Sequence, residues 1–233
     1  MIKAVIFDLD GTLLDREQSI EKFVWAQYDK FSSAFLGVSQ SDYVKRFIEL
    51  DEKGYVWKDK VYQQLIDVFN ITSVTWEELL QDYWDNFSKY CVPFEGLTTT
   101  LDFLYERKIQ LGIISNGYTQ FQLSNIGSLN IRNYFQIICI SENEGTKKPE
   151  AAIFNNTLAK IGVVASECIY VGDHSINDIR GANEVGMKTI WKEVPEWDQT
   201  DADYTIKNLK EITEIIQALI SKEDCDCYIN KVT

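Results

Sequence analysis

The sequence predicts an α/β fold, in which helices flank a parallel β-sheet, with a helical segment inserted near the N-terminus. Short apolar runs that suit strands buried on both faces alternate with amphipathic stretches that suit helices. This alternation predicts βαβ units, and hence a parallel sheet with right-handed crossovers. It is interrupted once, between residues 15 and 93, by a stretch without any convincing buried strand.

The candidate strands are five short apolar runs. The first run, residues 3–7, reads Lys-Ala-Val-Ile-Phe and stops at an aspartate. Continuous apolar runs of this length are typical of strands that are covered on both faces of a sheet. The other four runs are 110–115, 135–140, 168–171 and 187–191.

Amphipathic helices are expected both between these strands and inside the insertion. Those between the strands span 99–107, 118–129, 150–161, 176–185 and 209–221. Those in the insertion are rich in aromatic residues and span 20–35, 41–47, 58–69 and 76–90. Thr75 and Glu78 have the spacing of a capping box, which marks the start of the last of them. We expect most of the aromatic residues to pack a small helical bundle.

Charge and hydropathy argue against several classes of partner. The chain of 233 residues has a formal net charge of −13, whereas binding nucleic acid phosphates requires clustered lysine and arginine. The same charge disfavours an anionic membrane surface, and no run approaches the roughly 20 apolar residues of a membrane span. The first ten residues already contain charges, unlike a signal peptide. We therefore expect a cytoplasmic protein that binds neither nucleic acid nor membrane.

The five cysteines indicate neither a disulfide framework nor a zinc site. Cys91, Cys139 and Cys168 stand in apolar surroundings and are interpreted as small core residues. Cys225 and Cys227 form an Asp-Cys-Asp-Cys tail that lacks the further ligands and spacing of a zinc site. We therefore expect reduced cysteines.

Two carboxylates and a glycine follow the first strand in the motif Asp8-Leu-Asp10-Gly-Thr12. In open α/β sheets, ligands bind at the carboxyl ends of the strands, which is where this motif is expected. A carboxylate pair can act as nucleophile and general acid/base, and it can also hold Mg²⁺, which prefers oxygen ligands. A solvated Asp-x-Asp loop is the alternative.

Two further motifs suit an anionic ligand. Ser115 and Asn116, followed by glycine, stand where a strand turns into a helix, and hydroxyl and backbone N–H groups there can bind phosphate. An ordinary helix cap is the alternative. Lys148 precedes a proline and is therefore held extended, so that it can reach into a cleft and neutralise a phosphoryl group. The alternative, a surface lysine, fits Lys147 better.

A second acidic pair ends the strand at 168–171, with Asp173 in a Gly-Asp sequence and Asp178 five residues later. This pair would complete the oxygen ligands of a hard cation. For the neighbouring His174, the only histidine, we expect local hydrogen bonding rather than catalysis.

The order and spacing of these motifs resemble the haloacid dehalogenase-like (HAD) superfamily. The four motifs are Asp8-x-Asp10-Gly-Thr, Ser115-Asn116, Gly-x-x-Lys148-Pro and Gly-Asp173-x₄-Asp178. The resemblance covers residues 1–14 and about 94–220, and it implies a discontinuous Rossmann-like core domain formed by 1–14 and 94–233. Residues 15–93 resemble the helical (C1-type) cap domain of the subfamily that contains phosphoglycolate phosphatase, β-phosphoglucomutase and 2-haloacid dehalogenase.

The resemblance also implies a role for each residue of the first and fourth motifs. Asp8 would be the nucleophile that forms an aspartyl-phosphate, and Asp10 would be the general acid/base. The cofactor Mg²⁺ would be held by the Asp8 carboxylate, the Asp10 backbone carbonyl and Asp173. Asp178 would support the metal or orient the catalytic lysine, and Thr12 would support the loop around Asp10.

The phosphoryl oxygens would be bound by Ser115, by the backbone of Asn116 and by Lys148. The resemblance also implies that Lys148 is a catalytic residue. Without Mg²⁺ and a lysine, the repulsion between Asp8 and a phosphate would be severe in a cleft of low dielectric constant. Positioning and charge neutralisation therefore carry much of the catalysis that this resemblance implies.

Asp10 separates the reaction classes of the family. A halide leaves carbon without needing a proton, and the dehalogenases of the family lack this second aspartate. The phosphonatases also depart there and use a lysine of the cap domain. The sequence therefore predicts a Mg²⁺-dependent phosphatase for a small phosphorylated metabolite. A phosphomutase of the β-phosphoglucomutase type and a catalytically idle HAD-fold binding module are the alternatives.

The substrate and the oligomeric state stay open at this point. Sugar phosphates, phosphoglycolate and nucleoside monophosphates all fit the motifs, and so do a monomer and a homodimer. The insertion offers six candidate substrate contacts, without a ranking: Gln18, Phe23, Arg46, Tyr55, Trp57 and Lys58.

Overall fold

The computed structural model describes residues 1–195 and 200–232, with side chains up to residue 221. The chain divides into two compact units. The core unit consists of Met1–Leu14 and Pro93–Thr233, and the helical unit consists of Asp15–Val92. Two short strands, β2 (Leu14–Asp15) and β3 (Val92–Pro93), pair where the chain passes between the units. No helix in the described part of the chain is long and apolar enough to cross a membrane.

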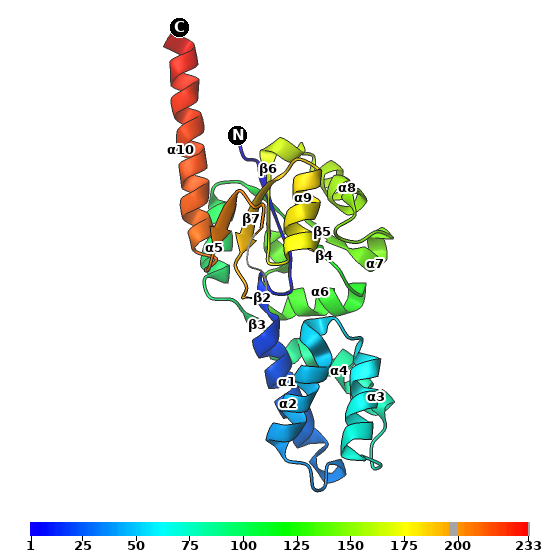
Figure 1. Ribbon diagram of the computed structural model, residues 1–233. Coiled ribbons are helices and arrows are strands. Elements are labelled where there is room, and N and C mark those ends of the chain that lie inside the picture. The colour runs from blue at the N-terminus through cyan, green and yellow to red at the C-terminus, as the bar shows by residue number, and fades with distance from the viewer. Residues whose placement is uncertain (196–199, 233) are drawn as a thin grey trace. The chain divides into compact units, whose positions relative to one another are not determined.

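The core unit contains a six-stranded sheet of the order β5-β4-β1-β6-β7-β8, in which every pair is parallel. This arrangement confirms the predicted α/β fold (Figure 1). β1 lies in the middle, with Ala4 opposite Gln110 of β4 and Cys168 of β6. The strands are β1 (Ala4–Phe7), β4 (Gln110–Ser115), β5 (Ile137–Ile140), β6 (Cys168–Gly172), β7 (Lys188–Lys192) and β8 (Tyr204–Ile206).

Helices cover both faces of the sheet, with α8 and α9 on one side and α5 and α10 on the other (Figure 1). The helix expected over 209–221 begins at Glu211 and continues beyond Ser221 to Val232. The helices of this unit are α5 (Leu97–Glu106), α6 (Thr119–Ser128), α7 (Ser141–Glu144), α8 (Ala151–Ile161), α9 (Gly181–Glu184) and α10 (Glu211–Val232).

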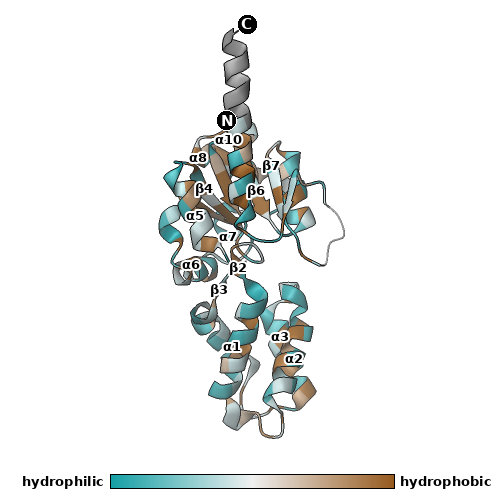
Figure 2. Cartoon of the chain, turned by 90° about the vertical axis from the view of Figure 1, so that its left-hand side faces the viewer, coloured by the Kyte–Doolittle hydropathy of each residue, from teal (hydrophilic) through white to brown (hydrophobic). Residues whose placement is uncertain are grey.

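The hydrophobic core of this unit is formed by the strands and the helix faces that cover them. Figure 2 shows hydrophobic residues concentrated on the strands. All four residues of β1 are completely buried, as expected for a strand covered on both faces. Ile153 and Phe154 of α8 pack against Ile6 and Tyr170 from the middle of the sheet. This packing fixes β1 and β6, the two strands from whose ends the acidic motifs continue.

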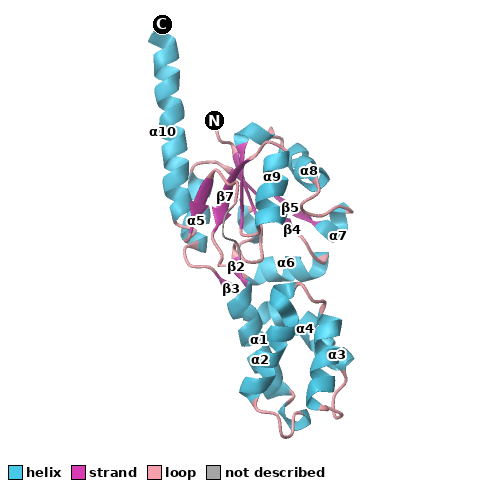
Figure 3. Ribbon diagram, viewed as in Figure 1, coloured by secondary structure: helices cyan, strands magenta, loops and turns pink. Residues whose placement is uncertain are grey.

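The helical unit is a bundle of four helices, and residues 16–91 contain only helices, turns and connecting loops (Figure 3). Thr75 and Glu78 form the predicted capping box, with Glu78 N–H donating to Thr75 Oγ1 at 3.2 Å and Thr75 N–H to Glu78 Oε2 at 2.8 Å. Aromatic side chains fill the interior, for example Phe35 stacked on Tyr43 with ring centroids 4.5 Å apart. The helices are α1 (Arg16–Lys30), α2 (Gln40–Asp51), α3 (Lys58–Phe69) and α4 (Trp76–Asn86).

Candidate active site

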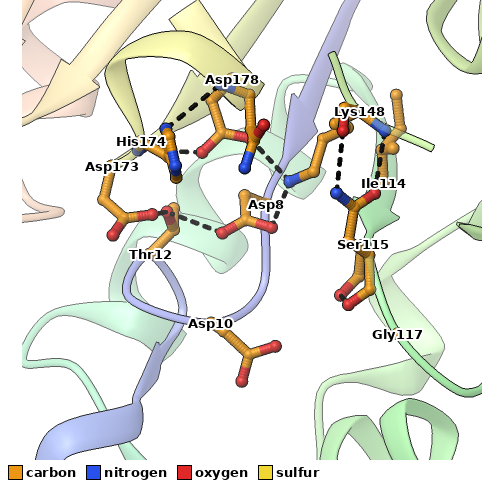
Figure 4. A network of polar contacts seen from close by, with 12 residues as sticks. Asp8, Asp10, Thr12, Ile114, Ser115, Gly117, Lys148, Asp173, His174 and Asp178 are labelled. Carbon is orange, nitrogen blue, oxygen red and sulfur yellow. Dashed lines mark hydrogen bonds and ion pairs between the residues drawn. The ribbon is translucent and has the colours of Figure 1, made fainter. Parts of the chain in front are cut away.

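The motif residues lie where β1, β4 and β6 end, because these three strands are neighbours in the sheet. Asp8 directly follows β1, and its N–H donates to Val171 O of β6 at 2.9 Å. Ser115 is the last residue of β4, and Asp173 directly follows β6. Figure 4 shows the carboxylates of Asp8 and Asp178 facing the ammonium of Lys148, which comes from the loop before α8.

The Lys148 ammonium has three partners in the interior. Nζ donates to Asp8 Oδ1 at 2.5 Å, to Asp178 Oδ1 at 2.6 Å and to Tyr170 Oη at 3.2 Å. These contacts match the three donors of a lysine, and the residue is only 4% exposed. Neighbouring Lys147 is exposed. The structure therefore places the second lysine of the pair, and not the first, among the carboxylates.

The side chain of Asn116 holds the backbone of Lys148. Asn116 Nδ2 donates to Lys148 O at 3.0 Å, and Lys148 N–H donates to Asn116 Oδ1 at 2.9 Å. This paired contact connects the turn after β4 to the loop before α8. With its side chain engaged in this way, Asn116 has its backbone as the group to offer a phosphate, which is the role that the sequence resemblance implies.

Asp8, Asp173 and Asp178 form an acidic cluster. Each offers one carboxylate oxygen, and the three oxygens lie within 4.8 Å of one another. Thr12 Oγ1 lies 3.5 Å from Asp8 Oδ2 and 3.4 Å from Asp173 Oδ1, so it connects the first and fourth motifs. Gly11 allows this approach, because a Cβ at its position would lie 2.3 Å from Asp173 Oδ2.

Asp178 is positioned by a π-helical turn, Ser175–Arg180, that follows β6. Its Oδ2 accepts from His174 N–H at 3.0 Å, while its Oδ1 accepts from Lys148 and from Tyr170 Oη, the latter at 3.1 Å. Gly172 makes room for it, since a Cβ there would lie 2.4 Å from Asp178 Cβ. Both oxygens of Asp178 thus have partners from the protein itself.

His174 caps the same turn. Its Nδ1 accepts from the N–H groups of Ile176 at 3.1 Å and Asn177 at 3.2 Å. Burial lowers the pKa of this imidazole, which favours the neutral form that an accepting Nδ1 requires. The predicted role of His174 in local hydrogen bonding is confirmed.

Burial and mutual repulsion dominate the electrostatics of the cluster. Burial raises the pKa of Asp8 well above its usual value, against the attraction of Lys148. Burial and the charge of Asp178 raise the pKa of Asp173 to about 7. Burial disfavours the charged form of Lys148, but Asp178 and Asp8 outweigh it and raise the pKa of the ammonium. The lysine is therefore charged, and its single positive charge is too little to offset the three carboxylates.

The donor set fits Mg²⁺. Three carboxylates share one lysine, so a fully ionised cluster has an excess of two negative charges. A divalent cation would offset this excess, and carboxylate oxygens are the ligands that Mg²⁺ prefers. Asp178 accepts three close hydrogen bonds over its two oxygens, whereas Asp8 Oδ2 and Asp173 Oδ1 have only the long contacts to Thr12, so Asp8 and Asp173 are the better candidates for direct ligands.

Asp10 and Ser115 are connected through Gln122, which the sequence motifs do not include. Gln122 Nε2 donates to Asp10 Oδ2 at 2.5 Å and to Ser115 Oγ at 2.8 Å. Gln122 lies on α6 and is buried together with Asn125 and Ile126. No signal in the sequence marks Gln122, because a polar residue of an amphipathic helix is expected on the solvent-facing side.

Comparisons with known proteins agree with the motifs and the fold. The family model of the haloacid dehalogenase-like hydrolases matches residues 5–192. A glyceraldehyde 3-phosphate phosphatase from Pyrococcus furiosus is 28% identical over 93% of this chain and 93% of its own length. A ribulose-1,5-bisphosphate 5-phosphatase from Halopiger xanaduensis is 27% identical over 93% of this chain and its full length.

A solved structure leads to the same family. The crystal structure of a HAD phosphatase from Thermococcus onnurineus is 29% identical to this chain, with a TM-score of 0.66, and covers 92% of this chain and 98% of its own. The described parallel sheet, the ordered motifs and the family match over most of the length agree. The chain therefore belongs to the haloacid dehalogenase-like hydrolases.

Proposed function

We propose that this protein is a Mg²⁺-dependent phosphatase that hydrolyses a small phosphate monoester through an aspartyl-phosphate on Asp8. The observation that carries the proposal is the contact between Asp8 and the buried Lys148 within a group of three carboxylates. This arrangement provides a nucleophile, a fixed positive charge and oxygen ligands for a cation at one place. The relatives from Pyrococcus furiosus and Halopiger xanaduensis, both named for sugar-phosphate substrates, support a sugar phosphate as the substrate class.

In the first step, the Asp8 carboxylate attacks phosphorus and the bond from phosphorus to the leaving oxygen breaks. Asp10 donates a proton to that oxygen, so that an alcohol leaves instead of an alkoxide. The Lys148 ammonium and the Ser115 hydroxyl stabilise the charge that develops on the phosphoryl oxygens. In the second step, a water attacks the phosphorus of the aspartyl-phosphate while Asp10 takes a proton from it. The bond between phosphorus and the Asp8 oxygen breaks, which releases phosphate and regenerates the Asp8 carboxylate.

Mg²⁺ would be held by the carboxylates of Asp8 and Asp173 and by the backbone carbonyl of Asp10. When bound, it supplies the positive charge that allows a carboxylate and a phosphate dianion to meet. Asp178 keeps Lys148 in place from the opposite side through the 2.6 Å contact. Thr12, which contacts both Asp8 and Asp173, supports the ligand pair.

The test is a phosphatase assay with the purified protein, with and without Mg²⁺. The substrates are p-nitrophenyl phosphate and four alkyl phosphates: glyceraldehyde 3-phosphate, ribulose 1,5-bisphosphate, phosphoglycolate and a nucleoside monophosphate. We expect Mg²⁺-dependent release of phosphate, abolished in Asp8→Asn and kept in Asp201→Asn, a matched change of an exposed carboxylate in the core unit.

Other outcomes distinguish the alternatives. Activity of Asp8→Asn at the wild-type level would overturn the proposed nucleophile. Rapid interconversion of sugar phosphates with little free phosphate would indicate a phosphomutase. The absence of both activities in a folded wild-type protein would indicate a binding module.

A further inference from the structure

The Gln122 side chain contacts residues of two different motifs. Gln122 is 3% exposed, and its Nε2 lies 2.5 Å from Asp10 Oδ2 of the loop after β1. The same nitrogen lies 2.8 Å from Ser115 Oγ at the end of β4 and 3.3 Å from Asn116 O. An amide has two N–H donors, and the two shortest contacts account for them. Gln122 therefore links Asp10 to Ser115.

The chemistry of its neighbours fixes the orientation of the Gln122 amide. A carboxyl oxygen that carries no proton only accepts hydrogen bonds, so the amide group that faces Asp10 Oδ2 is the NH₂. The opposite end agrees, because Gln122 Oε1 accepts from Asn125 Nδ2 at 3.0 Å. Asn125 is completely buried on the same helix. The amide is thus held from both ends, which reduces its freedom to rotate.

The turn after β4 makes room for this side chain. Gly117 has φ +145°, and a Cβ there would lie 3.3 Å from Gln122 Cγ and from Nε2. That separation is tighter than ordinary van der Waals contact, so a larger residue would push the amide away. The close approach of Gln122 and the positive φ both explain why the Ser-Asn-Gly turn has a glycine at position 117.

The contact also orients the Ser115 hydroxyl. Because Ser115 Oγ accepts from Gln122 at 2.8 Å, its own hydrogen is left to donate, and its acceptor in this structure is Asn116 O at the long distance of 3.5 Å, a contact that a phosphoryl oxygen could replace. A donor is what a phosphoryl oxygen requires. Gln122 would therefore affect both the proton-transfer residue and a phosphate ligand of the proposed site.

We propose that Gln122 is a positioning residue that holds the Asp10 carboxylate for proton transfer to the leaving oxygen, an inference that rests on the proposed function. The Asp10 carboxylate points away from Asp8 (Figure 4) and toward a partner of its own on α6. This hydrogen bond limits the positions that Asp10 samples, so that its proton is delivered at the leaving group. Without the amide, Asp10 would spend less time where the alkoxide oxygen needs it.

The test uses the leaving group as its readout. p-Nitrophenolate leaves without a proton, whereas an alkoxide needs one. The value of kcat/KM reports the first step, the transfer of the phosphoryl group to Asp8. In that step only the alkyl esters depend on the general acid. For Gln122→Met, we expect the ratio of kcat/KM for an alkyl phosphate to that for p-nitrophenyl phosphate to fall at least about tenfold. A positioned general acid accelerates a reaction by roughly 10²–10⁴-fold, and the expected fall corresponds to the loss of a part of this acceleration. The alkyl phosphate is the one that the wild-type protein hydrolyses fastest in the panel above.

The ratio separates positioning from general damage. Both esters carry the same phosphoryl group, so a loss of phosphate binding or of folded protein lowers both values equally and leaves the ratio unchanged. Gln122→Glu keeps the length of the side chain but replaces the donor with a carboxylate oxygen, and we expect the same fall. Gln120→Met, the same change at an exposed position of α6, should leave the ratio at the wild-type value.

An unchanged ratio in both Gln122 variants would overturn the inference. If the wild-type protein hydrolyses neither ester, the proposed function fails, and crystal structures then decide the role of Gln122. We expect the Asp10 side chain to be displaced in Gln122→Met relative to the wild type. An undisplaced Asp10 would also overturn the inference.

Discussion

Buried carboxylates in the two units differ in how their charges are matched. In the helical unit, the buried carboxylate of Asp82 accepts from Gln27 at 3.1 Å, from Asn86 at 2.8 Å and from Lys30. In the core unit, three carboxylates surround the single ammonium of Lys148. Asp82 has neutral donors and its own cation, whereas the core cluster has too little positive charge.

This difference separates a structural ion pair from a site that fits a cation. A buried charge is tolerated when it is paired and hydrogen-bonded, and the surroundings of Asp82 meet that condition. In the core cluster, Asp8 and Asp178 share the single ammonium of Lys148, and burial raises the pKa of Asp8 and Asp173. An arrangement that disfavours its own ionised state in the absence of a cation is the electrostatic pattern of a functional site.

The largest expected effect is that of removing the ammonium of the core cluster. Lys148→Met should lower kcat for phosphate ester hydrolysis by about 10²–10³-fold, the usual cost of losing one donor to a developing oxyanion. It also leaves the carboxylates of Asp8 and Asp178 without their cation. Steady-state kinetics with saturating Mg²⁺ measure the first effect, and binding of inorganic phosphate measures the contribution to affinity.

Full activity of Lys148→Met would contradict the assignment of Lys148 as the charge that faces the phosphoryl group. Lys147→Met is the matched control, because Lys147 is adjacent in sequence but exposed. We expect wild-type kinetics for this variant.

A smaller effect is expected on the thermodynamics of metal binding. Mg²⁺ at 100 times its Kd should stabilise the wild-type protein by about 2.7 kcal/mol, since it binds only the folded state. Asp173→Asn removes a proposed ligand and should abolish most of this gain, measured as the shift in thermal unfolding upon adding Mg²⁺. The same substitution at Asp82 should leave the Mg²⁺-dependent shift intact.

A full Mg²⁺-dependent shift in Asp173→Asn would place the cation elsewhere. Calorimetric titration of both variants with Mg²⁺ provides the comparison without any assay of activity.

The sequence predicts most of the sheet, and within the site it predicts the charged residues better than the residues that position them. Five of the six strands in the sheet are expected, because they are continuous apolar runs. β8 is missed because its three residues do not form a continuous apolar run: Tyr204 is half-buried, Thr205 is exposed and Ile206 is buried, as is typical of a short strand at the edge of a sheet.

Within the site, the four ordered motifs are visible in the sequence, but their partners are not. Tyr170 belongs to an apolar strand and resembles a core residue until its hydroxyl is found beside Lys148 and Asp178. Gln122 resembles one of many polar residues on a helix until α6 packs with that face inward. Such contacts depend on tertiary packing, which local sequence patterns do not encode.

The smallest expected effect is that of removing the cation of the helical unit. Lys30→Met repeats the substitution of Lys148, but the Lys30 side chain is 56% exposed and Asp82 keeps its bonds from Gln27 and Asn86. An ion pair that is this exposed contributes about 0.2–1 kcal/mol, which urea denaturation can measure. Because Lys30 has no place in the proposed chemistry, we expect kcat, KM and the Mg²⁺-dependent stabilisation to equal those of the wild type. A large loss of activity in this variant would mean that Lys30 and Asp82 serve the reaction. The surroundings of Asp82 would then not be purely structural, in spite of their matched charges.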